Sequence, residues 1–381
     1  MRTWYALYAV SAPPRPKRLG PYDVVVKIAG GGMATIYLGR AKGENGVERV
    51  AAIKVIRHEL RHDAQVVQMF LDEANILRRL SHPNIAGTYE FGSDDQLHFI
   101  AMELLVGRTV LDVFEACRAN KLALRLDMAA WIGARVCDAL QYAHDLNDEH
   151  GAPLHVIHRD VNPSNIFLTH SGEVKLFDFG LAKARGRDAK SQADIVKGKL
   201  PYLSPEQVAQ TPIDRRSDVF TLGTTIWELT TMRRLFKRDD DVETLLAVKA
   251  GLVPDPRATV PTYPEELWRI VKHSLERDPN DRYATAADFG RALDAFALAH
   301  GAGVDMPELV GAILDKLFPG ERRKQAMWLR QSSAPSTATA RATMAPPAPL
   351  AGTATPSIAP PLPKKPRSVP KMRVRKPSSG E

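Results

Sequence analysis

Short apolar runs separated by glycine-containing turns fill the first third of the chain, and this pattern predicts β-strands. The expected strands are residues 22–29, 35–41, 49–57, 88–91 and 97–104. Between the third and fourth of them, Met69, Phe70, Ile76 and Leu77 recur with the spacing of one helix face, which predicts a helix over 66–80. The first part of the chain is therefore expected to be a β-rich unit that carries one helix.

After Gly107 the spacing of apolar residues changes to that of helices. Ile132, Val136, Leu140 and Ala143 mark one face of a long helix. Short strands are expected again at 166–168 and 174–177, then helices from 214 to about 317, with an amphipathic helix over 303–330 that packs on the helical part. The predicted fold class is α+β, with a small β-rich half at 21–103 and a larger helical half at 108–300.

The composition is that of a globular protein: 381 residues, 44% hydrophobic and 25% charged. No apolar run reaches the length of a membrane span, so none is expected. Two cysteines, Cys117 and Cys137, are too few for a disulfide framework or a zinc site. They are expected to be reduced thiols of a cytoplasmic protein.

The net charge of +8 belongs to the two ends of the chain. Residues 1–20 hold four basic and no acidic residues, and residues 331–381 hold eight basic residues and one Glu, so the segment between them is slightly acidic. A basic globular face for nucleic acid is therefore not indicated. The basic tail would suit an acidic partner, although a solvated tail is the simpler interpretation.

Both ends are expected to be disordered. The tail 331–381 holds eleven of the 28 prolines and no aromatic residue, so it buries too little apolar surface to offset its ordering entropy. The leader 1–20 contains an apolar run at 4–10 that a signal peptide would also show. The basic residues that follow this run favour a disordered extension instead.

Two segments of the β-rich half carry candidate phosphate-binding groups. Residues 28–36, Ile-Ala-Gly-Gly-Gly-Met-Ala-Thr-Ile, lie between two expected strands, where backbone amides can approach a phosphate, although a Gly-rich hairpin alone is usually structural. Lys54 lies in an apolar strand, where a solvent-facing edge lysine is the simpler interpretation of that segment alone, but Glu73 shares a helix face with Phe70 and Leu77. An anion among apolar neighbours needs a cation, so we expect Glu73 to pair with Lys54.

The helical half carries candidate oxygen ligands. In residues 158–165, His-Arg-Asp-Val-Asn-Pro-Ser-Asn, Pro163 is expected to exclude a helix and to make a rigid loop that presents Asp160 and Asn165. Asp178 stands at the end of the next strand. Carboxylate and amide oxygens suit Mg²⁺ together with phosphate oxygens. A lone loop Asp is usually a turn residue, but three such groups within nineteen residues, after the Lys–Glu pair, indicate one site.

These motifs, in this order, resemble the protein kinase family, specifically its bacterial serine/threonine branch. The resemblance runs from about Tyr22 to His300. It implies a two-lobed kinase domain at 21–300, followed by a helical extension at 301–330, that transfers the ATP γ-phosphate to Ser or Thr hydroxyls of protein substrates. It also implies ATP and Mg²⁺ as small-molecule partners and a role, with autophosphorylation, in bacterial signal transduction.

The resemblance implies roles for individual residues. Asp160 would accept the hydroxyl proton, Asn165 and Asp178 would bind Mg²⁺, and Lys54, held by Glu73, would contact the α- and β-phosphates. Glu206 would pair with Arg282, Asp218 would anchor the catalytic loop, Met102 looks like the gatekeeper and 103–106 like the hinge. The residues implied around ATP are Ile28, Ala29, Gly30, Gly31, Gly32, Met33, Ala34, Ile36, Ala52, Lys54, Glu73, Met102, Glu103 and Leu105.

Three features depart from the family pattern. Ala29 and Ala34 replace two loop glycines, and because alanine disfavours φ > 0 a stiffer loop is expected. Asn162 stands where the family has a lysine that touches the γ-phosphate, and Lys199 where it has a threonine. Our hypothesis is that Lys199 supplies the charge missing at position 162; the alternative is an exposed loop lysine and lowered activity.

The family is often phosphorylated in the segment that corresponds to residues 180–204, and Ser191 is the only Ser or Thr between Gly180 and Ser204. The resemblance therefore implies Ser191 as the autophosphorylation site, with Arg159 as the group that would receive the phosphate. A second interpretation of the chain is a pseudokinase that acts as a nucleotide-binding switch or scaffold. A third, a small-molecule kinase, is disfavoured by the expected pairing of Glu206 with Arg282.

Overall fold

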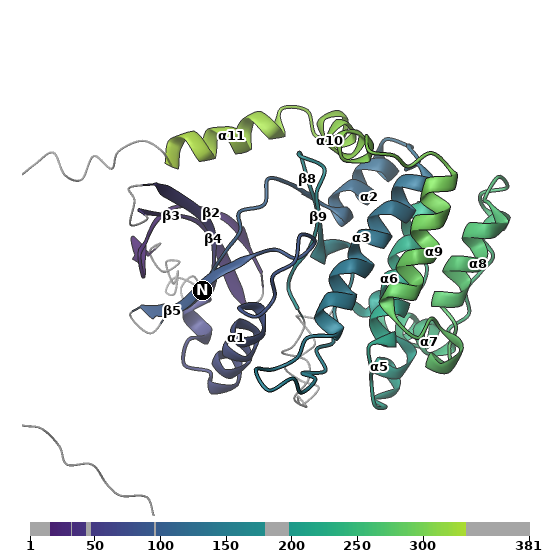
Figure 1. Cartoon of the computed structure of the whole chain (residues 1–381), viewed down its shortest axis with the longest axis horizontal. Coiled ribbons are helices and arrows are strands. Elements are labelled where there is room, and N and C mark those ends of the chain that lie inside the picture. The colour runs from purple at the N-terminus through teal and green to yellow at the C-terminus, as the bar shows by residue number, and fades with distance from the viewer. Residues whose placement is uncertain (1–15, 32, 43–46, 95–96, 180–197, 333–381) are drawn as a thin grey trace, which may run out of the picture. The chain divides into compact units, whose positions relative to one another are not determined.

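The computed structural model describes residues 16–31, 33–42, 47–94, 97–179 and 198–332. Figure 1 shows a β-sheet with one helix, α1 (Ala64–Leu77), beside it, and a larger group of helices to the right of both. The fold is the α+β arrangement of two lobes that the sequence predicts, and that prediction is confirmed. The site described below lies where the two lobes meet.

The first lobe is an antiparallel sheet with the strand order β1-β2-β3-β4-β6-β5. Its small core includes Leu19, Tyr22, Ile53 and Phe99. Helix α1 begins at Asp63, whose side chain accepts hydrogen bonds from the Gln65 and Val66 amides. The strands are β1 (Arg18–Leu19), β2 (Tyr22–Gly30), β3 (Ala34–Lys42), β4 (Glu48–Ile56), β5 (Thr88–Asp94) and β6 (Leu97–Met102).

The second lobe is helical and centres on α6 (Arg216–Thr231), in which every residue after Arg216 is buried. It also holds a three-stranded sheet of β7 (Gly107–Thr109), β8 (Ile166–Thr169) and β9 (Val174–Leu176). This sheet carries the loops that present Asp160 and Asp178. The other helices are α2 (Val110–Ala119), α3 (Leu126–His144), α5 (Pro205–Ala209), α7 (Asp241–Ala250), α8 (Glu265–Ser274) and α9 (Ala286–Ala299).

The segment expected to be one helix over 303–330 is instead two, α10 (Met306–Leu317) and α11 (Glu321–Ser332). The break falls at Pro319, which has no N–H to continue the helix, and at Gly320, which has φ +81°. Helix α10 packs on the second lobe through Met306, Val310 and Leu314, all fully buried. Helix α11 runs on from α10 toward the β-sheet side (Figure 1), and its Gln325 donates to the Gly107 carbonyl at 3.1 Å.

The expectation of disorder through residue 20 is wrong for its last part. Leu19 in β1 is 1% exposed and packs beside Tyr22, and the Gly20 amide donates to the Asp94 side chain at 3.1 Å. An apolar side chain in reach of the sheet core gains enough burial to order this short segment. At the other end, α11 includes the first two residues of the expected tail, Gln331 and Ser332.

None of the helices in the part of the chain that the structure describes is both long and apolar enough to cross a membrane.

Candidate active site

Lys54 joins the two lobes through two short ion pairs. Its Nζ lies 2.7 Å from Glu73 Oε1 on α1 and 2.7 Å from Asp178 Oδ1 after β9. Lys54 is not at an edge of the sheet, because β4 lies between β3 and β6 and Lys54 is opposite Ile36 and Ile100. Its side chain is therefore held among apolar neighbours, and it is 13% exposed.

The ionisation of this cluster follows from burial and mutual charge. Burial disfavours the Lys54 ammonium, but Asp178 and Glu73 outweigh it and raise the pKa of Lys54. Desolvation opposes the charge of Asp178 too, yet Lys54 and then Lys199 hold the pKa of Asp178 below its ordinary value. Burial keeps the pKa of Glu73 raised despite Lys54. The ion pair of Lys54 with Asp178 is thus the more firmly charged of the two.

Asp160 lies next to a backbone turn that two asparagines, Asn162 and Asn165, hold in place. Pro163 lies in a loop without an α-helix, as expected, and it starts a single 3₁₀ turn, Pro163–Asn165, in which its missing N–H costs no hydrogen bond. Asn165 Nδ2 donates to the Asp160 carbonyl at 2.8 Å and to Asp160 Oδ2 at 3.0 Å. A side chain of its own loop therefore helps to hold the Asp160 carboxylate in place.

Asp218 on α6 anchors the Asp160 loop through hydrogen bonds to its backbone. Its Oδ2 accepts from the His158 amide and from His144 Nε2, and its Oδ1 from the Arg159 amide, each at 2.8 Å. Arg159 has φ +64°, an unfavourable conformation for a residue with a side chain, and these bonds hold it there. Burial opposes the charge of Asp218, but the bonds from His144 and the amides lower its pKa. His144 thus has a supporting role that the sequence analysis did not assign to it.

The two alanines of the Gly-rich turn, Ala29 and Ala34, have regular strand conformations. Ala29 pairs with Ile36, and Ala34 with Ile56, as regular strand residues. Neither alanine has a positive φ. The Gly31 amide donates to the Ala34 carbonyl at 2.9 Å, which closes the turn around Met33. Ile28 and Gly30 lie in β2; Gly32 is outside the described residues.

The residues expected near adenine lie in β4, at the end of β6 and in the connection that follows β6. Ala52, two residues from Lys54 on the same side of β4, is opposite Met102. The Glu103 amide donates to the Gly87 carbonyl at 2.7 Å, and Leu105 follows in the connection to β7. Within the described residues the Leu105 N–H makes no backbone hydrogen bond, so it can serve a ligand.

The chemistry of the donor set fits a hard cation. Asn165 uses its amide nitrogen on Asp160, and Asp178 uses one oxygen on Lys54, which leaves Asn165 Oδ1 and Asp178 Oδ2 without partners among the described residues. One amide and one carboxylate oxygen are ligands that Mg²⁺ takes when phosphate and water complete its shell. No cluster of three His, Cys, Asp or Glu in the described ranges would hold a metal alone. A cation here would therefore depend on the phosphates.

Glu206 and Arg282 lie together in the second lobe. Arg282 Nη1 and Nη2 donate to the two Glu206 oxygens at 2.8 and 2.9 Å, and the Ser217 hydroxyl also donates to Glu206 at 2.5 Å. Desolvation opposes the charge of Glu206, but the bonds from Arg282 lower its pKa. The pair ties α5 to the turn before α9. Ser191 lies outside the described residues.

Two charged groups near the site were missed at the sequence level. Lys175 on β9 is buried and pairs with Glu103 at 3.1 Å, which links the residue after β6 to the strand before Asp178. Glu228 on α6 is 0% exposed and accepts from the Tyr202 hydroxyl at 2.6 Å and Arg234 at 2.9 Å. Lys175 is a charged residue in an apolar strand, which is the same sequence signal that marked Lys54. The sequence around Arg234 contains no signal of similar strength.

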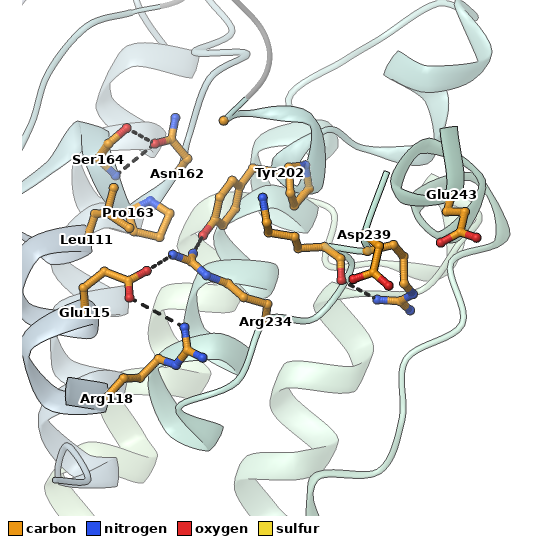
Figure 2. Close-up of a pocket in the computed structure, with 14 residues that line it drawn as sticks. Leu111, Glu115, Arg118, Asn162, Pro163, Ser164, Tyr202, Arg234, Asp239 and Glu243 are labelled. Carbon is orange, nitrogen blue, oxygen red and sulfur yellow. Dashed lines mark hydrogen bonds and ion pairs between the residues drawn. The ribbon is translucent and has the colours of Figure 1, made fainter. Parts of the chain in front are cut away.

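A groove of about 660 Å³ opens beside the Asp160 loop. Its walls come from α2, the 3₁₀ turn at Pro163, and the chain around Tyr202 and Arg234 (Figure 2). Arg234 contacts Glu115 and Tyr202 across it. The groove is open, mixed in charge and lined by Asn162 and Ser164 of the Asp160 loop, so it can take a segment of polypeptide.

Residues 22–290 match the family model of the protein kinase domain. The chain belongs to the protein kinase family. The order of motifs and the two-lobed fold agree with this membership, and the resemblance inferred from the sequence is confirmed. The PknI kinase domain of Mycobacterium tuberculosis has the same fold, with a TM-score of 0.54 over 75% of this chain and 99% of that one, at 24% identity.

Curated kinases are similar over most of the chain. Tyrosine-protein kinase MasK of Myxococcus xanthus is 37% identical over 85% of this chain and 49% of its own length. Serine/threonine-protein kinase PknB of Mycolicibacterium smegmatis is 33% identical over 76% and 44%, and PrkC of Bacillus subtilis 31% over 72% and 41%. The chain thus spans half or less of the length of these relatives.

Proposed function

We propose that this chain is an ATP-dependent protein kinase that phosphorylates Ser and Thr residues of proteins, itself included, in bacterial signalling. The observation that carries the proposal is the placement of Lys54. Its single ammonium contacts both Glu73 and Asp178; Asp178 follows β9, and β9 pairs with β8, the strand that starts just after Asn165. This brings together groups for phosphate, metal and hydroxyl.

In the proposed reaction the acceptor oxygen bonds to the γ-phosphorus while the bond from that phosphorus to the β,γ-bridging oxygen breaks. The proton of the hydroxyl passes to Asp160. Mg²⁺, held by Asn165 Oδ1 and Asp178 Oδ2, would neutralise phosphate charge when bound. Lys54 would hold the α- and β-phosphates, and the Leu105 amide and the Glu103 carbonyl would meet adenine. The protein contributes mainly alignment and charge.

The groove in Figure 2 is the proposed place of the acceptor segment. It adjoins Asn162 and Ser164 of the Asp160 loop, so a peptide lying in it would bring a side-chain hydroxyl to Asp160. Serine and threonine are the proposed acceptors, as in PknB and PrkC. MasK is named a tyrosine kinase, and phosphotyrosine is therefore the competing outcome.

Incubation with γ-³²P-labelled ATP and Mg²⁺, followed by phosphoamino acid analysis, tests the proposal. Label on phosphoserine or phosphothreonine that is lost in Asp160→Asn supports it, and label on phosphotyrosine moves the acceptor class. Nucleotide binding without label transfer, in the wild type and in Asp160→Asn alike, would mean a pseudokinase. Asp160→Asn is a close match in size, so it also controls for folding.

Other predictions remain untested by the structure. Ser191 as an autophosphorylation site can be checked by phosphosite mapping on the same labelled protein. The contact of the basic tail with an acidic partner and a cytoplasmic location also stay predictions.

A further inference from the structure

A second ammonium group lies at the Asp160 carboxylate. Lys199 caps the 3₁₀ turn Leu200–Tyr202, and its Nζ donates to Asp160 Oδ2. The Asp160 side chain is 9% exposed and that of Lys199 32%, so the pair lies at the rim of the site rather than on open surface. Asp160 Oδ2 is thereby shared between Asn165, inside the loop, and Lys199, which arrives from another segment.

Position 162 cannot provide a cation here. Asn162 is 2% exposed, its Nδ2 donates to the Asp160 carbonyl at 2.8 Å, and its Oδ1 accepts from the Ser164 amide at 2.9 Å and from the Ser164 hydroxyl. Figure 2 shows this side chain turned onto Ser164. Its role is to cap the turn that starts at Pro163. The positive charge beside Asp160 must therefore come from elsewhere in the chain.

Lys54 does not meet that need, because two carboxylates already engage it. The cluster holds three carboxylates, Glu73, Asp160 and Asp178, and two ammonium groups, and Lys54 contacts Glu73 and Asp178 while Lys199 contacts Asp160. A lysine has three N–H donors, so the Lys199 ammonium retains donors beyond the one on Asp160. These are placed at the side of Asp160 where the acceptor hydroxyl and the transferred phosphoryl group would meet.

We propose that Lys199 is a catalytic residue that binds the γ-phosphoryl oxygens of ATP beside Asp160, in place of any cation from the Asp160 loop itself. The proposal rests on the proposed kinase function. It makes the residue at the start of the 3₁₀ turn Leu200–Tyr202 part of the catalytic machinery. It also predicts a preference for ATP over ADP that depends on this one side chain, since only ATP carries the γ-phosphate.

The test compares wild type with Lys199→Met, Lys199→Arg, and the double variants Lys199→Met/Asn162→Lys and Lys199→Met/Asn162→Ala. Lys199→Met keeps the side-chain length without charge, and we expect kcat to fall about 100-fold. Lys199→Arg should retain most activity. Asn162→Lys brings a cation to the other side of Asp160 and should restore kcat at least about tenfold, whereas Asn162→Ala, which loses the same cap, should not.

The second readout does not need turnover. Calorimetric titration with ADP and with the β,γ-imido analogue of ATP gives the ratio of their Kd values. Lys199→Met should lower the preference for the triphosphate by about tenfold, the effect of one lost charged contact. Thermal unfolding of each variant confirms that it is folded.

The results separate the alternatives. If Lys199→Met changes neither kcat nor the ratio of the two nucleotide Kd values, Lys199 has no part in catalysis. If kcat rises, Lys199 inhibits the wild type by blocking Asp160. Either result overturns the proposal. A loss that Asn162→Lys and Asn162→Ala restore equally would mean a structural role and overturns it as well. Absence of phosphotransfer in the wild type would count against the kinase function, while the nucleotide ratio would still judge Lys199.

Discussion

Arg282 and Glu206 face each other through two parallel hydrogen bonds of 2.8 and 2.9 Å, with the Arg282 side chain fully buried. Arg282 also donates to the carbonyls of Glu276, Arg277 and Arg216, so one guanidinium ties together the turn before α9, the start of α6 and α5. A planar fork of donors is required for this, and a lysine cannot reproduce it.

Arg282→Met should therefore lower the free energy of unfolding by about 3–5 kcal/mol, because it leaves a buried carboxylate without its cation. Arg282→Lys should recover only part of this loss. Urea unfolding followed by tryptophan fluorescence measures both. The double variant Arg282→Met/Glu206→Gln removes charge on both sides, and it should be more stable than Arg282→Met alone; if it is less stable, the ion pair is not the main contribution.

Lys54→Met should lower kcat by at least about 100-fold, since it removes the charge proposed for the phosphates. The substitution also leaves Glu73 and Asp178 without the cation that lies 2.7 Å from each. Glu73→Gln is the matched variant: it keeps Lys54 and its contact with Asp178, so its loss of kcat should be smaller. Steady-state kinetics on one peptide substrate provides both numbers, and equal losses would argue that Lys54 acts only through α1.

Much of this site could be predicted from the sequence because each group stands out against its local pattern. Glu73 on an apolar helix face needs a cation, and this need made Lys54 the predicted partner, although the strand of Lys54 alone favoured a solvent-facing edge lysine. Asp160, Asn165 and Asp178 stand at loop positions fixed by a proline and a strand end. The pattern alone does not predict contacts between distant segments: the approach of Lys199 to Asp160, 39 residues away in the chain, was expected only through the family resemblance.

The parts that were wrong concern short segments whose order depends on tertiary contacts. Leu19 looked like part of a polar leader, but its burial against Tyr22 makes β1. The single helix expected over 303–330 took no account of Pro319. Pro163 starts a turn, where its missing N–H is not needed, whereas Pro319 stands where a helix would need that N–H. Position within an element, which the sequence pattern leaves uncertain, decides between these outcomes.

His158 should make the stability depend on pH below neutrality. Its Nδ1 accepts from the Asp160 amide at 3.3 Å and its Nε2 donates to the Phe177 carbonyl at 3.2 Å, which fixes the neutral ring. Burial lowers the pKa of His158 from 6.5. Below pH 6.5 the unfolded chain binds a proton that the folded state excludes. The free energy of unfolding should therefore fall as the pH drops, by up to about 1.4 kcal/mol per pH unit for this group.

His158→Phe removes the titrating group but keeps a ring against Phe179, so the slope of stability with pH below 6.5 should be smaller than in the wild type. Urea unfolding at a series of pH values measures the slope, which is independent of the constant loss of the two hydrogen bonds. The same substitution at the exposed His150 is the comparison variant. Parallel slopes for wild type and His158→Phe would contradict the prediction.

Gly172 and Gly151 offer a matched pair that isolates how tightly α10 is docked. Both have a positive φ, +86° and +81°. A Cβ added at Gly172 would lie 2.1 Å from the Pro307 carbonyl oxygen of α10, whereas a Cβ at Gly151 would meet nothing within 4 Å. Alanine at either position bears the backbone strain, about 1–2 kcal/mol, but only alanine at Gly172 must also displace α10.

Gly172→Ala should therefore destabilise the protein by about 1–3 kcal/mol more than Gly151→Ala. Hydrogen exchange should show the loss of protection first in α10, because the buried Met306, Val310 and Leu314 leave the second lobe with it. Since α11 continues from α10 and Gln325 contacts Gly107, protection of α11 should fall as well. Equal destabilisation by the two alanines, with α10 still protected, would mean that the turn at Gly172 adapts and that α10 does not depend on this contact.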